Sequence, residues 1–440
     1  MTDEIRSTIR LFHQIENATP AGGRDLWLAK CTLFEKNSYR LPASSRNDLL
    51  IGFRVLFRTL KRYRFEPQEI TVAHNSEATV LGGTVAHRET ILKYISASSG
   101  ISALSFVPRD IMGLRYGLRP SGLIAFLVFA LPIAIKTIFQ KRRDNYALTI
   151  SSVAEIALIL SFLKSVKCSY AFDFYSFESD SNFMYLALSA QSIRVCKIPS
   201  SGPLASHYLK TLCDDLVIST PYQQEEITAL GRDMVFTRIL HWPPERAHTY
   251  YSKFCVGKVQ LPANVIGFYS HGQWLRNLAG HAGYGVGVEE DEIKILSFIK
   301  NYCDHRPLVA VKIFPHPREL KDEVLEKTQR FYDQHLGKGN YELMLSEGGS
   351  AQHFDRVNVA IASYSTIIYE RLYCGMKILI SKNSKPGFPI PSSVLNNICF
   401  SEEKEFDMKL ERALHQSEEE FFSGNQLEPF RWNNFPSPLQ

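Results

Sequence analysis

The sequence lacks the cysteine patterns that mark zinc-binding or disulfide-rich proteins. Its 8 cysteines include no CxxC pair and no Cys/His spacing of a zinc site, and most of them lie in apolar stretches. The N-terminal stretch MTDEIRSTIR is charged and has no apolar core of a signal peptide. We therefore expect a cytoplasmic chain whose thiols stay reduced and pack as small hydrophobic side chains.

The sequence also lacks a strong excess of charge of one sign. The 50 basic and 45 acidic residues leave a formal net charge of +5, which is too small to indicate nucleic-acid binding. With 45% hydrophobic and 22% charged residues, the composition is that of a globular protein and excludes disordered, collagen-like and coiled-coil chains. A length of 440 residues predicts two domains.

Long hydrophobic runs are missing too, with one borderline case at residues 121–139. This stretch contains Pro132 and Lys136, and a membrane span needs roughly 20 apolar residues. Basic residues flank it on both sides, so residues 115–143 are typical of a peripheral contact with anionic lipid on the inner face of the cytoplasmic membrane. The alternative is a core helix with a solvated basic end.

Short apolar runs alternate with helical periods along the chain, which predicts βα units and largely parallel sheets. The expected strands are residues 69–73, 169–174, 192–196, 215–219, 264–269, 308–313, 341–345, 359–362 and 377–381. Trp242, Pro243 and Pro244 interrupt this pattern. We therefore predict an α/β chain of two Rossmann-like domains, residues 1–245 and 246–440, with the last residues packing back on the first domain.

Two segments of the second half carry candidate binding residues directly after expected strands, where open α/β sheets bind ligands. His271 and Gly272 begin a glycine-bearing loop, and glycine lets backbone amides approach a phosphate closely. The loop has neither the GxGxxG nor the P-loop spacing. His316 lies between Pro315 and Pro317, whose fixed backbone angles aim the ring at one place.

A third segment, SYSTIIYE, follows the expected strand at residues 359–362 and opens a helix. Ser363, Ser365 and Thr366 either cap this helix or bind phosphate oxygens together with its amides and dipole. Glu370, one turn into the helix, is placed to accept a hydrogen bond from a ribose hydroxyl or to face solvent. Arg318 beside His316 supplies positive charge for a leaving phosphate, and so does Lys312 unless it pairs with a carboxylate.

In this order, FPHPRE and SYSTIIYE resemble the donor-nucleotide half of GT-B glycosyltransferases. They look most like the bacterial enzymes of capsule and lipopolysaccharide assembly that carry an HP and a Ser-Ser/Thr motif, such as sialyltransferases. The resemblance extends over residues 262–400. It implies two domains that face each other across a cleft, a CMP-linked sugar as donor, contacts to it from His316, Ser365 and Thr366, and no metal ion or cofactor.

An inverting transfer also requires a base that takes a proton from the acceptor hydroxyl. The sialyltransferase pattern supplies it from an acidic-Gly pair in the N-terminal domain, and the first half of this chain has no DDG or EDG triplet. The candidates here are Asp173, Glu178 and Glu77, of which Asp173 is favoured because it ends an expected strand.

The expected function is the transfer of a sugar from a nucleotide donor to a bacterial surface glycan or a lipid-linked acceptor. Three alternatives remain at this point. One is a glycerol- or ribitol-phosphate transferase of the teichoic-acid type that uses a CDP-alditol. The second is a nucleotide-sugar epimerase of the same fold. The third is a non-catalytic scaffold that binds glycans or nucleotides.

Overall fold

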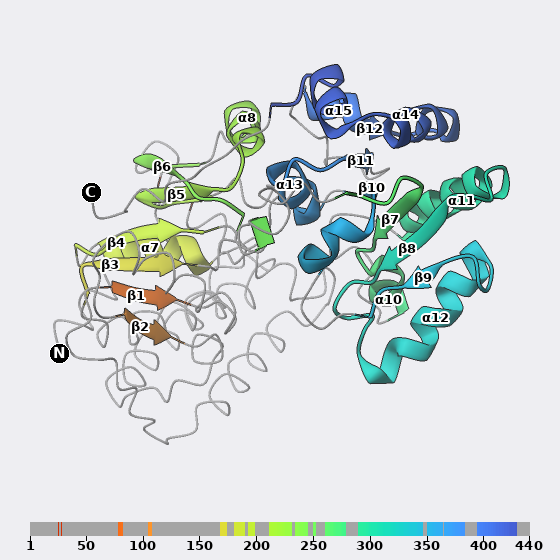
Figure 1. Ribbon diagram of the computed structural model, residues 1–440. Coiled ribbons are helices and arrows are strands. Elements are labelled where there is room, and N and C mark those ends of the chain that lie inside the picture. The colour runs from red at the N-terminus through yellow and green to blue at the C-terminus, as the bar shows by residue number, and fades with distance from the viewer. Residues whose placement is uncertain are drawn as a thin grey trace, which may run out of the picture.

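The computed structural model describes Asp25, Leu28 and residues 78–81, 104–107, 168–173, 180–189, 192–198, 211–230, 234–244, 250–251, 260–278, 289–345, 350–363, 365–382 and 394–428. These residues form two six-stranded sheets with helices packed on them (Figure 1). Each pairing of strands in them is parallel. The predicted α/β class with two Rossmann-like sheets is confirmed.

Several predictions concern segments outside the described residues. They are the strand at residues 69–73, the carboxylates Glu77 and Glu178, the apolar segment 115–143 and most of the glycine-bearing loop.

The first sheet has the strand order β2-β1-β3-β4-β5-β6. Its strands are β1 (Ala78–Leu81), β2 (Leu104–Val107), β3 (Tyr170–Asp173), β4 (Arg194–Lys197), β5 (Asp215–Ile218) and β6 (Arg238–His241). The described helices with them are α7 (Asp180–Ser189) and α8 (Pro221–Leu230). The expected strands at β3, β4 and β5 are confirmed, whereas β6 was not predicted.

The second sheet has the order β12-β11-β10-β7-β8-β9. Its strands are β7 (Val265–Tyr269), β8 (Ala310–Phe314), β9 (Glu342–Leu343), β10 (Val359–Ala362), β11 (Ile378–Ser381) and β12 (Cys399–Phe400). The helices are α10 (Gln273–Leu278), α11 (Glu289–Asp304), α12 (Asp322–Leu336), α13 (Thr366–Tyr373), α14 (Glu403–His415) and α15 (Glu418–Gly424), with 3-10 turns η4 (Ser350–Arg356) and η5 (Leu395–Ile398). All five strands expected in this half are confirmed, because each is a short apolar run that is buried in the sheet.

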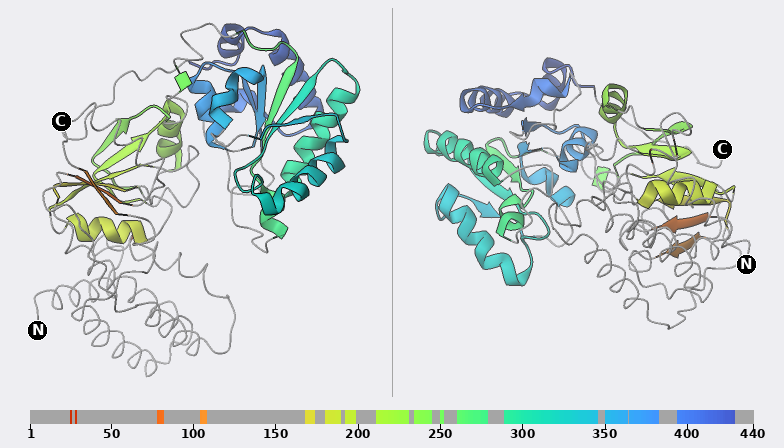
Figure 2. Two further views of the ribbon diagram at one scale, coloured as in Figure 1. Left: turned by 60° about the horizontal axis from the view of Figure 1, so that its bottom comes forward. Right: turned by 180° about the vertical axis from the view of Figure 1, so that it is seen from behind.

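The order of the second sheet reverses between β7 and β10. From β7 the chain moves to β8 and β9 on one side, and from β10 to β11 and β12 on the other. Because crossovers between parallel strands are right-handed, α11 and α12 lie on one face of the sheet and α13 on the opposite face (Figure 2). Open α/β sheets bind ligands at such a reversal, at the carboxyl ends of the strands. The first sheet reverses in the same way between β1 and β3.

The chain leaves the first sheet after β6 and enters the second at β7. Tyr222 of α8 nevertheless belongs to the buried cluster that surrounds the second sheet. Tyr251 also lies against Tyr373 of α13, with 5.1 Å between the ring centroids. The division between residues 245 and 246 stays a prediction.

A buried carboxylate joins four strands at the amino-terminal edge of the first sheet. Asp215 of β5 accepts hydrogen bonds from the Tyr170 hydroxyl of β3 at 2.5 Å and from Nε of Arg238 of β6 at 2.5 Å. Arg194 of β4 binds the same carboxylate through two nitrogens, at 2.8 and 3.0 Å. The Asp215 side chain is fully buried, so its charge is satisfied only through these groups.

We expect Asp215→Asn to destabilise the first sheet by about 2–4 kcal/mol, because an amide cannot accept from all of these donors. Hydrogen-exchange mass spectrometry should show faster exchange in peptides that contain β3, β4 and β5, and unchanged exchange in β7 and β10. Glu326→Gln, which removes an exposed pair with Arg330, is the control and should have an effect below about 0.5 kcal/mol. Equal acceleration in both sheets would contradict the assignment.

Candidate functional site

The turn after β7 is held by a carboxylate from another helix. Glu292, in the first turn of α11, is only 2% exposed. Its Oε1 accepts from the amides of His271 at 2.6 Å and Gly272 at 3.1 Å and from the Ser270 hydroxyl at 3.0 Å. Its Oε2 accepts from the amides of Gln273 at 2.8 Å and Trp274 at 3.4 Å. The first amides of α10 are therefore already bonded to protein.

The HP turn after β8 is held by a second buried carboxylate. Glu319 accepts at Oε2 from the backbone amide of His316 at 2.6 Å. Its Oε1 accepts from the Trp274 indole at 2.5 Å and from the Tyr332 hydroxyl of α12 at 3.0 Å. Glu319 is fully buried, and these bonds fix the backbone of the HP turn.

Gly272 brings the two turns into contact. Its φ is +62°, in the left-handed region that glycine adopts at no steric cost. A Cβ at this position would lie 3.3 Å from Cβ of His316 and 3.5 Å from Cγ of Glu319. The absence of a side chain therefore allows the close approach of the His316 turn.

The orientation of the half-buried His316 ring is set by its own turn. Its Nδ1 accepts a hydrogen bond from the backbone amide of Arg318 at 3.2 Å. Because an acceptor nitrogen needs its lone pair, the proton of the neutral ring lies on Nε2. His316 thus offers an N–H donor, and Pro317 and Arg318 beside it are exposed.

The third turn meets the first at the reversal of strand order. Ser363 follows β10, is 4% exposed, and places its Oγ 3.0 Å from Nδ1 of His271. Ser365 is the N-cap residue of α13, but its side chain makes no capping hydrogen bond. Thr366 is the first residue of the helix, and Glu370 is buried at 6% exposure instead of facing solvent.

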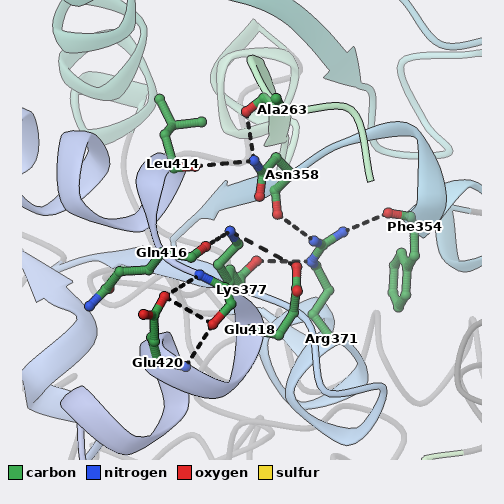
Figure 3. A network of polar contacts seen from close by, with 10 residues as sticks. Ala263, Phe354, Asn358, Arg371, Lys377, Leu414, Gln416, Glu418 and Glu420 are labelled. Atoms are coloured by element: carbon green, nitrogen blue, oxygen red, sulfur yellow. Dashed lines mark hydrogen bonds and ion pairs between the residues drawn. The ribbon is translucent and has the colours of Figure 1, made fainter. Parts of the chain in front are cut away.

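A buried cation anchors α13 from its far side (Figure 3). The guanidinium of Arg371 donates to the carbonyls of Lys377 at 3.1 Å, Phe354 at 3.2 Å and Asn358 at 3.2 Å. The ammonium of Lys377 donates to the carbonyl of Gln416 at 2.6 Å. Burial lowers the pKa of both groups, and the carbonyls around them replace the lost hydration. The direction of α13 is thereby fixed by hydrogen bonds to three different segments.

Of the predicted donor-binding residues, His271, Gly272, His316 and Ser363 lie together at the carboxyl ends of β7, β8 and β10. Ser365, Thr366 and Glu370 lie on α13, which begins beside this group. Lys312 does not contribute, because its ammonium pairs with Glu342, its register partner on β9.

The residues that sequence reasoning missed are the supporting ones: Ser270, Trp274, Glu292, Glu319 and Tyr332. Glu292 was interpreted only as an acidic residue in a first turn, and Glu319 was quoted in FPHPRE without a role. A glutamate three residues after His316, with a carboxylate able to bond back to the His316 amide, was the available signal.

In the first sheet, Asp173 ends β3 beside the reversal of strand order. It is 2% exposed, and its register partner on β4 is Lys197, which is 1% exposed. The Lys197 ammonium donates to Oδ1 of Asn182 at 2.8 Å. The favoured base candidate therefore lies in a buried polar group at the ligand-binding edge of the first sheet.

Two further searches concern the described residues alone. Among them no cluster of His, Cys, Asp and Glu side chains could hold a metal ion. Each helix in these parts of the chain is too short or too polar to cross a membrane.

Comparisons with known proteins give a likeness of fold only. No protein-family profile and no curated protein matches the chain. The UDP complex of MnaA from S. aureus is 9% identical, with 81% of this chain and 92% of that chain covered and a TM-score of 0.47. The UDP-GlcNAc 2-epimerase of Neisseria meningitidis is 12% identical, with 76% and 90% covered and a TM-score of 0.44. The wall teichoic acid polymerase TagF is 11% identical, with 86% and 92% covered and a TM-score of 0.40. Because these TM-scores lie below 0.5, we infer function from the site geometry.

We expect Gly272→Ala to be more destabilising than Gly375→Ala. Both glycines have a left-handed φ, +62° and +70°, but a Cβ at Gly375 meets nothing within 4 Å. Each substitution should lose about 1–2 kcal/mol from backbone strain, and Gly272→Ala should lose more because its methyl group presses on His316. Urea unfolding measures the difference, and equal losses would show that the two turns do not need this close contact.

Proposed function

We propose that this chain is a glycosyltransferase that moves a sugar from a nucleotide donor to a glycan or lipid-linked acceptor. The second sheet would hold the donor and the first sheet would present the acceptor. The observation that supports this best is the contact between His271 and Ser363 at the reversal of strand order, with the His316 turn packed against Gly272 beside it. Three polar turns meeting at that edge are what a nucleotide site requires.

The donor phosphates are assigned to the N-terminus of α13. The amides at the start of α10 already donate to Glu292, so they are not available to a ligand. The Ser365 hydroxyl makes no cap, and it lies with Thr366 at the positive end of the α13 dipole. His316 would donate to a phosphate oxygen through Nε2, and Glu370 would accept from a ribose hydroxyl.

The proposed step is a single displacement. An oxygen of the acceptor forms a bond to the anomeric carbon as the bond from that carbon to the donor phosphate breaks. The proton of the acceptor hydroxyl passes to Asp173, and the nucleotide leaves with the electron pair. The dipole of α13 and the Arg318 guanidinium would stabilise the charge that develops on the leaving phosphate.

Binding of the nucleotide is the first test. We expect CMP to raise the melting temperature more than CDP, UDP, UMP or GDP in a thermal-shift screen, because a ligand of the native state stabilises it. His316→Ala should abolish most of this rise, whereas the control His415→Ala, far along α14 and exposed, should retain it. A preference for UDP would move the donor to another class, and one for CDP-glycerol would favour the teichoic-acid type.

Turnover is the second test. Asp173→Asn should reduce transfer by about 10²–10⁴-fold, the usual contribution of a general base, while donor binding stays unchanged. Glu225→Gln, an exposed carboxylate on α8 of the same sheet, is the control and should transfer normally. If Asp173→Asn keeps full activity, the base is another residue. If the wild type converts the donor without any acceptor, the chain is an epimerase.

A further inference from the structure

Two buried carboxylates lie against the turn that follows β7. The Gly272 amide donates to Oε1 of Glu292 at 3.1 Å, while a Cβ on the same residue would lie 3.6 Å from Cδ of Glu319. Trp274 joins them as well, since its amide donates to Glu292 and its indole to Glu319. The exposed fractions of the two glutamates are 2% and 0%.

No cation balances this pair among the described residues, since neither glutamate takes part in an ion pair there. Two like charges this close in a buried place cannot both be ionised at low cost, so one proton is retained. Burial and the Glu319 charge raise the pKa of Glu292 to about 7, and burial raises the pKa of Glu319. The proton belongs to the pair and not to one residue.

We propose that Glu292 and Glu319 are positioning residues that share one proton, and that this proton holds the turns of His271 and His316 together in the shape that binds the donor. The idea rests on the proposed function in one respect, because the ligand is taken to be a nucleotide-linked donor. Loss of the proton places a second negative charge beside Gly272. It separates the two turns and repels an anionic ligand, so donor binding weakens as the pH rises.

The sign of the stability effect is the same. The folded pair binds its proton more tightly than ordinary glutamates do in the unfolded chain. The stabilisation is therefore complete below the ordinary glutamate pKa near 4.5 and is lost as the pH rises through about 7. Other titratable or charged groups on the elements packed around the pair are Glu289, Asp291, Lys294, His271, His316, Arg318, Tyr332 and His335. The histidines titrate in a similar range, so the experiment must separate them from the glutamates.

The binding experiment uses CMP-sialic acid, UDP-GlcNAc and CDP-glycerol, whose esterified phosphates do not titrate near neutral pH. Calorimetric titration of the whole chain between about pH 5.5 and 8.5 should show at least tenfold weaker binding at the upper end, with a midpoint near 7. Glu319→Gln removes one charge and should move this midpoint down by more than one pH unit. His335→Asn, the matched control on α12, should leave the midpoint unchanged.

A purely structural role of Glu319 would weaken binding equally at every pH, and that result would overturn the proposal. A midpoint that follows His316→Asn and stays fixed in Glu319→Gln would overturn it too, because the titrating group would then be the histidine.

The ligand-free protein provides an independent measurement. With glutamate labelled by ¹³C at the carboxyl carbon, the NMR spectrum of the wild type should contain signals that titrate near pH 7, and these should move or vanish in Glu292→Gln. If the variants do not fold, the wild-type spectrum alone decides, and the absence of any glutamate titrating near neutral pH overturns the pair. If the signals titrate but no nucleotide binds, the shared proton stands and the proposed function fails.

Discussion

The arrangement of the second sheet depends on one buried anion, the carboxylate of Glu292. Parallel strands bring their carboxyl ends to one edge, but that alone leaves the turn after β7 with unsatisfied amides. Glu292 takes the amides of residues 271–274 and the Ser270 hydroxyl, and so ties the start of α11 to the start of α10. Because hydrogen bonds to a charged group contribute about 1.5–3 kcal/mol each, this turn has a single conformation.

The opposite face of the sheet uses a buried cation for the same purpose. Arg371 donates to three carbonyls from η4, the start of β10 and the segment before β11, and it thereby fixes α13. Neither Glu292 nor Arg371 is balanced chiefly by a side chain of opposite charge. Each is satisfied mainly by backbone groups, which fixes the position of chain segments more directly than a surface ion pair does. The candidate site lies between these two anchored elements.

The sequence predicted the parts of this structure that follow from local patterns. The strands of the second sheet are short apolar runs, and the rule that ligands bind at their carboxyl ends placed His271, His316 and Ser363 near each other. The strand β6 was missed because its sequence, RILH, is polar at both ends. The roles of Glu292 and Glu319 could not be predicted, because Glu292 lies about 20 residues after the turn it binds and Glu319 bonds to Trp274, 45 residues earlier.

These same bonds bear on where a catalytic base can come from. The oxygens of Glu292 and Glu319 are occupied by N–H and O–H donors, so neither carboxylate is available to remove a proton from an acceptor hydroxyl. A single displacement needs its base on the side of the sugar opposite the leaving phosphate. If α13 holds the phosphate, that side lies away from the second sheet. The first sheet offers Asp173 at its own reversal of strand order, which is why the proposed mechanism divides donor and base between the two sheets.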